Sequence, residues 1–183
     1  MSTTDLQKPA ITTRSATLTV ASVLVVAVCL TWTYLVMRSV MNVGGACADG
    51  GPYVSAQPCP DGTWLMALGV PVLIIASMIG TVSASSVGAP NLLVPMWGLL
   101  FGSLGWNFLE YSFAGPDIVW GWLVCGVMFW AMALPAFVFM LGGLRAAVGK
   151  RAESKAFLWI PVYGLLGAVG LLFGWWSFTA IAS

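Results

Sequence analysis

Charged residues are scarce and histidine is absent from this chain of 183 residues. Only 7% of the residues are Asp, Glu, Lys or Arg, whereas a soluble domain carries about 25%. A water-soluble surface cannot be built from so few charges. The missing histidine removes the usual haem ligand, most metal sites and the commonest general base. The net charge of +1 also gives no general electrostatic attraction for nucleic acid.

Catalytic signature motifs are missing as well. The chain has no G-x-x-x-x-G-K-[ST] phosphate loop, no G-x-G-x-x-G dinucleotide fingerprint, no H-E-x-x-H and no G-x-S-x-G. The sequence therefore indicates no catalytic residues, no cofactor and no metal site. It leaves open whether the protein is an enzyme, and it favours a role without catalysis.

Long apolar runs make up most of what is present, since 60% of the residues are hydrophobic. A bilayer is spanned by about 20 apolar residues in a helix. We predict an all-α, polytopic membrane bundle in which residues 17–183 form one membrane domain. The first run continues through Trp32 and Tyr34 into Arg38, so we interpret it as a retained helix rather than a signal peptide. The five transmembrane helices are expected at 17–37, 64–84, 92–112, 118–141 and 157–180.

The segments between these runs predict the orientation of the chain. Six of the seven Lys and Arg residues lie in the tail 1–16 and the connection 142–156, which share one side of a five-span chain. The loop 42–63, on the other side, has no basic residue. Because short segments rich in Lys and Arg stay in the cytoplasm, we predict an inner N-terminus and an outer C-terminus in the cell membrane. A four-span chain would place a basic segment outside the cell, so the charges argue against four spans.

The loop 42–63 contains two of the four cysteines, Cys47 and Cys59. In an oxidising outer compartment we expect them to form a structural disulfide. A redox-active pair is the alternative, but such pairs are usually C-x-x-C; free thiols or a metal site are others. The loop carboxylates Asp49 and Asp61 fit solvated acids better than a cation site, because no ligand ladder accompanies them. Cys29 and Cys125 lie within the predicted spans and are expected to pack inertly.

Polar residues at the outer ends of two spans form a candidate site. A carboxylate near a membrane span is costly unless it is paired or wet, which singles out Glu110. Asn107 lies three residues earlier on the same helix face, and Arg38 should lie at a similar depth at the end of the first span. We consider an ion pair between Arg38 and Glu110, within the chain or to a partner. The alternative is that both side chains reach the lipid headgroups, and a proton relay is a weaker one.

The pentapeptide GLLFG occurs at 98–102 and at 170–174. It places Gly98 with Gly102, and Gly170 with Gly174, as small-x-x-x-small pairs that let helix backbones approach closely. Packing inside the bundle and docking onto another membrane subunit both fit these pairs.

The sequence of the loop 42–63 also resembles that of a loop in other proteins. Its pattern GG-x-C-A-x-GGPY…PCP-x-G resembles a loop of uncharacterised actinobacterial multi-pass membrane proteins. The resemblance implies a plasma-membrane location and no particular activity. The matching residues are Gly44, Gly45, Cys47, Ala48, Gly50, Gly51, Pro52, Tyr53, Pro58, Cys59, Pro60 and Gly62.

Several functions fit these features. The first is a non-catalytic accessory or scaffold subunit of a membrane complex. The second is a small oligomeric transporter or channel, which requires a polar path through the spans. A third and weaker one is a membrane thiol oxidoreductase that uses the two loop cysteines. The expected partners are the lipid bilayer and either another membrane protein or further copies of this chain, and no nucleic acid.

Overall fold

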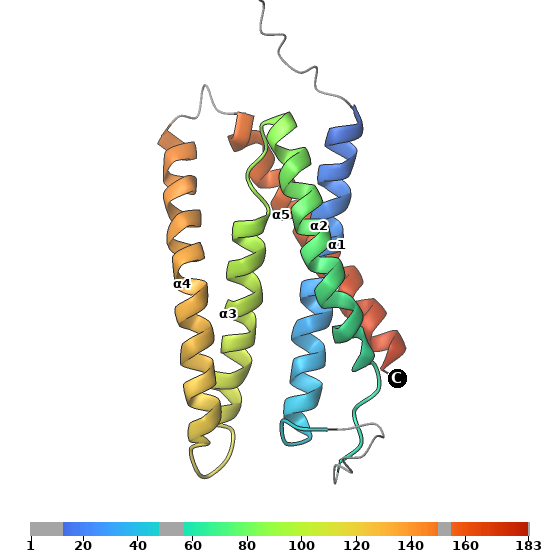
Figure 1. Cartoon of the computed structure of the whole chain (residues 1–183), viewed down its shortest axis with the longest axis vertical. Coiled ribbons are helices and arrows are strands. Elements are labelled where there is room, and N and C mark those ends of the chain that lie inside the picture. Colours follow the sequence, from blue (N-terminus) through green and yellow to red (C-terminus); the bar gives the residue numbers. More distant parts are fainter. Residues whose placement is uncertain (1–12, 48–56, 150–154, 183) are drawn as a thin grey trace, which may run out of the picture.

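A computed structural model describes residues 13–47, 57–149 and 155–182. These residues form α-helices and no strand, which confirms the prediction of an all-helical chain for this part. The helices are α1 (Thr13–Asn42), α2 (Trp64–Val87), α3 (Leu93–Ser112), α4 (Trp120–Gly149) and α5 (Lys155–Ile181) (Figure 1).

Most helices extend beyond the apolar runs that predict them. α1 begins at Thr13, inside the predicted tail 1–16, and continues to Asn42; the rest of that tail, 1–12, lies outside the described residues. α4 continues to Gly149 rather than ending at 141. An apolar run marks the part of a helix suited to hydrocarbon, whereas backbone hydrogen bonding continues into polar sequence until a turn ends it.

Four of the described helices are long and apolar enough to cross a membrane, namely α1, α2, α4 and α5. α3 is not among them. It has 20 residues, and Asn107 and Glu110 lie in its C-terminal half. These polar residues lower the hydropathy of a helix that the sequence predicts as a fifth span.

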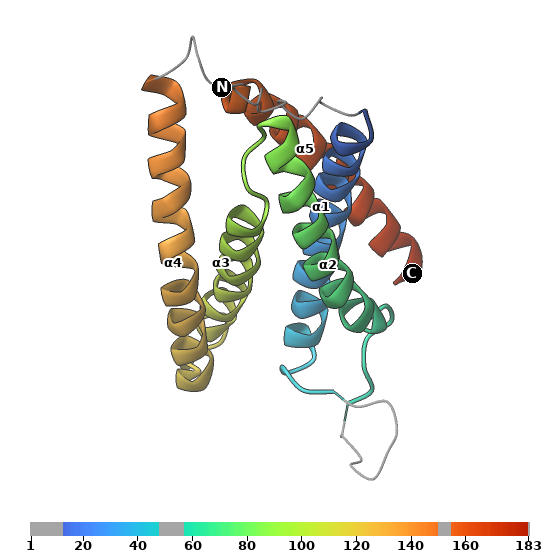
Figure 2. The ribbon, with the colours of Figure 1, turned by 45° about the horizontal axis from the view of Figure 1, so that its top comes forward.

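α1 is the central helix of the bundle. It packs against α2, α5 and α3, while α3 and α4 form an antiparallel hairpin with the most extensive contact in the protein. α5 crosses the bundle at a steep tilt (Figure 2) and touches α4 only slightly. The fold therefore has two parts, α1–α2–α5 and α3–α4, which meet mainly where α3 lies against α1.

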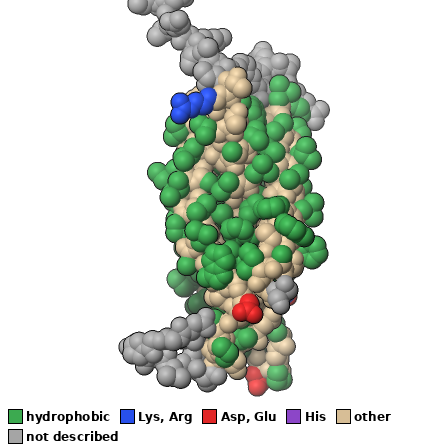
Figure 3. All heavy atoms as spheres, turned by 90° about the vertical axis from the view of Figure 1, so that its right-hand side faces the viewer, with side chains coloured by type: hydrophobic (Ala, Val, Ile, Leu, Met, Phe, Trp, Pro, Cys, Tyr) green, Lys and Arg blue, Asp and Glu red, His purple; other side chains and the backbone are tan. Residues whose placement is uncertain are grey.

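The core lies along α1. Its main cluster joins α1 residues such as Val26 and Leu30 to Leu73 of α2 and Met96 of α3. A second cluster joins Val36 to Leu65 of α2 and Phe178 of α5. α4 and α5, by contrast, have only 17% and 11% of their most apolar windows buried. Many of their large apolar side chains are exposed. Figure 3 shows that apolar side chains also cover the middle of the bundle on the side away from α4.

The connection 85–91 is a tight turn. α2 continues to Val87 and ends at Gly88, whose φ of 73° is left-handed. Only glycine adopts this conformation without strain, and it is the common end of a helix. The Asn91 side-chain oxygen then accepts a hydrogen bond from the Leu93 N–H at 2.7 Å, which caps the start of α3. This connection turns directly from α2 into α3.

Candidate functional site

Arg38 and Glu110 lie together near the C-terminal ends of α1 and α3. The Arg38 guanidinium donates two parallel hydrogen bonds to Glu110, from Nη1 to Oε2 at 2.6 Å and from Nη2 to Oε1 at 2.8 Å. The two side chains are 30% and 42% exposed. A bidentate arginine–carboxylate pair is stronger and more directional than a single contact. The sequence analysis considers this ion pair beside contact with lipid headgroups and a weaker proton relay, and here the pair forms within one chain.

Asn107 connects the same two helices beneath the ion pair. Its side chain is fully buried. Its Oδ1 accepts a hydrogen bond from Arg38 Nη1 at 3.4 Å. Its Nδ2 donates to the Tyr34 backbone carbonyl of α1 at 3.3 Å. A buried amide is costly unless it is hydrogen-bonded, so these bonds fix how α3 is positioned on α1.

Two tyrosines complete the cluster. The Arg38 guanidinium carbon lies 5.7 Å from the centre of the Tyr34 ring and 5.5 Å from that of Tyr111. Both distances suit a cation–π contact. The Tyr111 hydroxyl also donates a hydrogen bond to Asn42 Oδ1. We call Tyr34, Arg38, Asn107, Glu110 and Tyr111 the Arg38 cluster.

The sequence analysis missed the two tyrosines. Tyr34 precedes Arg38 by four residues and therefore shares its helix face, so spacing alone could have found it. Tyr111 is the residue after Glu110, and adjacent helical residues point about 100° apart, so its approach to Arg38 depends on how α3 is rotated against α1.

The Arg38 cluster links the two parts of the bundle and holds an arginine in a fixed orientation. Its charges neutralise each other, so it suits a structural link better than capture of a free ion.

Cys47 and Cys59 form a disulfide, with Cα atoms 4.9 Å apart. The bond joins the segment after α1 to the segment before α2, and residues 48–56 between them, including Asp49, lie outside the described residues. Closing a loop of this length stabilises a chain by about 3 kcal/mol through the entropy of the unfolded state. Of the other cysteines, Cys29 is buried in the core, whereas Cys125 is exposed on α4. Both lie within helices, as expected; Cys29 packs against its neighbours in the core, whereas the exposed side chain of Cys125 does not.

The segment that enters this loop packs against another helix. Gly45 has a φ of +82°, and a Cβ atom built on it would lie 3.0 Å from the Trp122 ring of α4. Trp122 in turn contacts the Tyr111 ring edge to face, with ring centres 6.4 Å apart. The start of the loop, the Arg38 cluster and the beginning of α4 thus form one continuous structure at this end of the protein.

Both glycine pairs pack within the chain. A Cβ on Gly98 or Gly102 would lie 3.2 Å from Ala136 or 3.0 Å from Phe137, both of α4. A Cβ on Gly170 would lie 2.6 Å from the Ala27 Cβ of α1, and one on Gly174 would lie 2.8 Å from the Thr31 Cβ. These four glycines therefore permit close approach of α3 to α4 and of α5 to α1. Their surfaces are already occupied, so they are not available to a partner.

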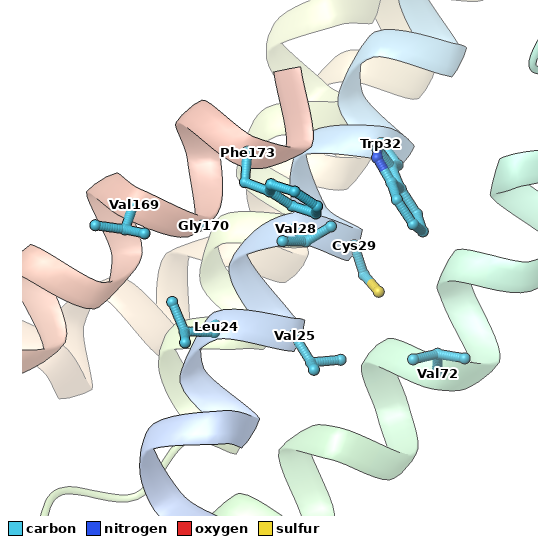
Figure 4. Close-up of a pocket in the computed structure, with 9 residues that line it drawn as sticks. All are labelled: Leu24, Val25, Val28, Cys29, Trp32, Val72, Val169, Gly170 and Phe173. Carbon is cyan, nitrogen blue, oxygen red and sulfur yellow. The ribbon is translucent and has the colours of Figure 1, made fainter. Parts of the chain in front are cut away.

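An apolar groove of about 440 Å³ runs between α1, α2 and α5 (Figure 4). Gly170 forms part of its floor, and Trp32, Phe173 and Val72 stand around it. The Trp32 Nε1 donates to Ser177 Oγ at 2.9 Å, which fixes the indole at one edge. The groove offers no polar group that could orient a substrate.

Comparison with known proteins finds no matching family model, no matching curated protein and no matching solved structure. The function therefore has to be argued from the residues and their arrangement.

Proposed function

We propose that this chain is a five-span protein of the cell membrane, with an inner N-terminus and an outer C-terminus, that serves as an accessory or scaffold subunit of a membrane complex. The four long apolar helices are compatible with an integral membrane protein. The role as a subunit is supported by one surface of α5.

That surface contains an unoccupied small-residue pair. Gly164 and Ala168 are both exposed and form a small-x-x-x-small pair. A Cβ built on Gly164 or on Gly167 would meet no atom within 4 Å. Six residues after Gly164 on the same helix, Gly170 is covered by α1. Helices in a membrane associate by close backbone approach at such faces, because lipid gives no hydrophobic driving force. α5 therefore uses one small face inside the chain and presents a second one outward.

The position of the described charges supports the orientation. Arg14 lies where α1 begins and Arg145 lies near the end of α4, and these helix ends point to the same end of the bundle (Figure 1). The carboxylates of Asp61, Glu110 and Asp117 lie in segments at the opposite end. Lysine and arginine mark the cytoplasmic side, so the first end is assigned to the cytoplasm.

The test is purification of the full chain in mild detergent, with mass spectrometry of whatever co-purifies. Gly164→Ile adds bulk to the outward small face and should leave the fold intact, because nothing lies above that position. Val138→Trp is the matched control, since it adds bulk to a 61% exposed residue of another helix, α4. Thermal unfolding of each variant checks the fold.

The proposal predicts a stoichiometric membrane-protein partner that is lost from Gly164→Ile and retained by Val138→Trp. A chain that purifies as a single, monodisperse species of one subunit type, unchanged by Gly164→Ile, would contradict it. Flux measurements in liposomes would then address the transporter alternative.

A further inference from the structure

A second groove, of about 400 Å³, lies between the beginning of α1 and the end of α2. It is lined by Ser15 and Leu18 of α1 and by Met78, Ile79, Val82, Ser83 and Ser86 of α2. We call it the α1–α2 groove. Unlike the groove between α1, α2 and α5, it has polar groups at one end.

The lining changes from polar to apolar along the helix axes. Ser86 is one residue from the end of α2, and Met78 lies eight residues deeper, which is about 12 Å along a helix. Ser15 is in the first turn of α1, and Leu18 lies one turn deeper. The exposed side chains of Met78 and Val82 line the deeper part, at 57% and 71% exposed. The groove therefore has the polarity gradient of a lipid molecule that enters from one membrane surface.

The floor of the groove is held by a hydrogen bond between the two helices. The buried hydroxyl of Thr19 lies 3.2 Å from that of Ser83. A Cβ on Gly80 would lie 2.7 Å from the Ser22 Cβ, so α1 and α2 approach closely just below it. The two walls are thus fixed relative to each other, and the groove does not depend on a flexible side chain.

A positive charge lies at the polar end. Arg14 precedes Leu18 by four residues, so the two share one face of α1. Within the described part of the chain, Arg14 has no carboxylate partner and Ser86 has no hydrogen-bond partner for its hydroxyl. The described carboxylates lie at the opposite end of the bundle, as described above. An exposed arginine at the end of the groove that carries the serine side chains suits a phosphate group.

We propose that the α1–α2 groove binds one acyl chain of an anionic phospholipid, with the headgroup phosphate against Arg14 and Ser86. This site is independent of the partner surface proposed on α5, because it lies on other helices. It requires only that α1 and α2 lie in a bilayer, and both are long and apolar enough to do so.

The test measures binding of two phospholipids with identical dioleoyl chains to the full protein in neutral detergent, by native mass spectrometry. One lipid is phosphatidylglycerol, which is anionic, and the other is phosphatidylcholine, which has no net charge. Arg14→Gln removes the charge, and Val82→Trp fills the apolar part at an exposed position. The matched controls are Arg145→Gln, which removes an exposed arginine from α4, and Leu165→Trp, which adds the same bulk on α5.

We expect phosphatidylglycerol to bind more tightly than phosphatidylcholine. One arginine near an anionic lipid surface contributes about fivefold in affinity, so Arg14→Gln should weaken phosphatidylglycerol binding by about that factor and leave phosphatidylcholine binding unchanged. Val82→Trp should weaken binding of both lipids, and neither control should weaken either. Glycerol 3-phosphate, a headgroup without chains, should not compete.

Three results would overturn the proposal. Equal affinity for the two lipids would remove the role of the charge. An equal effect of Arg14→Gln and Arg145→Gln would show attraction to the whole basic end rather than a site. Binding that occurs only after deletion of residues 1–12 would show that the protein's own tail is the occupant.

Discussion

Removing the ion pair between Arg38 and Glu110 should reduce stability by an amount that can be worked out from its geometry. Two unit charges 4 Å apart attract by about 1 kcal/mol in water and by about 4 kcal/mol in surroundings of dielectric constant 20. The two side chains are 30% and 42% exposed, so solvent screening places the pair near the lower value. The bidentate geometry, at 2.6 and 2.8 Å, adds directional hydrogen bonding. We expect a coupling energy of about 1–2 kcal/mol between the two side chains.

A double-mutant cycle measures this coupling without attributing to it the other contacts of each residue. The cycle compares Arg38→Gln, Glu110→Gln and the double variant with the parent protein, by reversible unfolding in mixed micelles with increasing SDS. Arg38→Gln should cost more than Glu110→Gln, because Arg38 also contacts Tyr34, Asn107 and Tyr111. The coupling should fall as salt is raised from about 0.05 to about 1 M, since screening shortens the range of exposed charges.

The reasoning would be refuted by a coupling energy indistinguishable from zero at low salt. It would equally be refuted by a Glu110→Gln variant that folds with the parent's stability and assembles as the parent does. Either result would mean that both side chains are held by lipid headgroups in the membrane, which is the other arrangement that the sequence allows.

Three further predictions concern stability. Gly170→Val should destabilise the fold by about 1–3 kcal/mol through overpacking, because its Cβ would lie 2.6 Å from a side-chain carbon of α1. Gly164→Val should be tolerated, because its Cβ would meet no atom within 4 Å. Thermal unfolding of the two variants tests this difference. Replacing Cys47 and Cys59 together by serine should lower the unfolding free energy by about 3 kcal/mol, and a reducing agent should lower the parent to the same value while leaving the variant unchanged. Asn107→Leu removes a fully buried amide that bonds to α1, so it should cost about 1–3 kcal/mol in the SDS titration; an unchanged midpoint would show that Asn107 does not hold α3 on α1.

The sequence predicts the helices well because each depends on a local property. An apolar run of about 20 residues between polar segments identifies a membrane helix without any knowledge of its neighbours. The exact ends of the helices are harder to predict from the sequence, as the extension of α1 to Thr13 and of α4 to Gly149 shows. Helix ends depend on caps and turns, which sequence patterns locate only to within a few residues.

The candidate site is predictable only in part, for a different reason. The pairing of Arg38 with Glu110 can be predicted from their opposite charges and their expected depth, since they lie at the outer ends of the first and third predicted spans. Whether the glycine pairs pack inside the chain or against a partner depends on the rotation of α3 and α5 about their axes, which the sequence does not specify. The structure covers Gly102 and Gly170 and leaves Gly164 open. The surface that we propose for a partner, at Gly164, is therefore not formed by either of the two glycine pairs that the sequence analysis identifies.

Crosslinking in native membranes tests the proposed role as a subunit most directly. A photoreactive phenylalanine would replace Ala168, on the outward small face of α5, and separately Val138, a 61% exposed residue of α4. We predict that illumination joins the Ala168 variant to a discrete membrane protein, that Gly164→Ile in the same chain abolishes this product, and that the Val138 variant gives lipid adducts alone. Lipid adducts at both positions, with no protein product, would contradict the account.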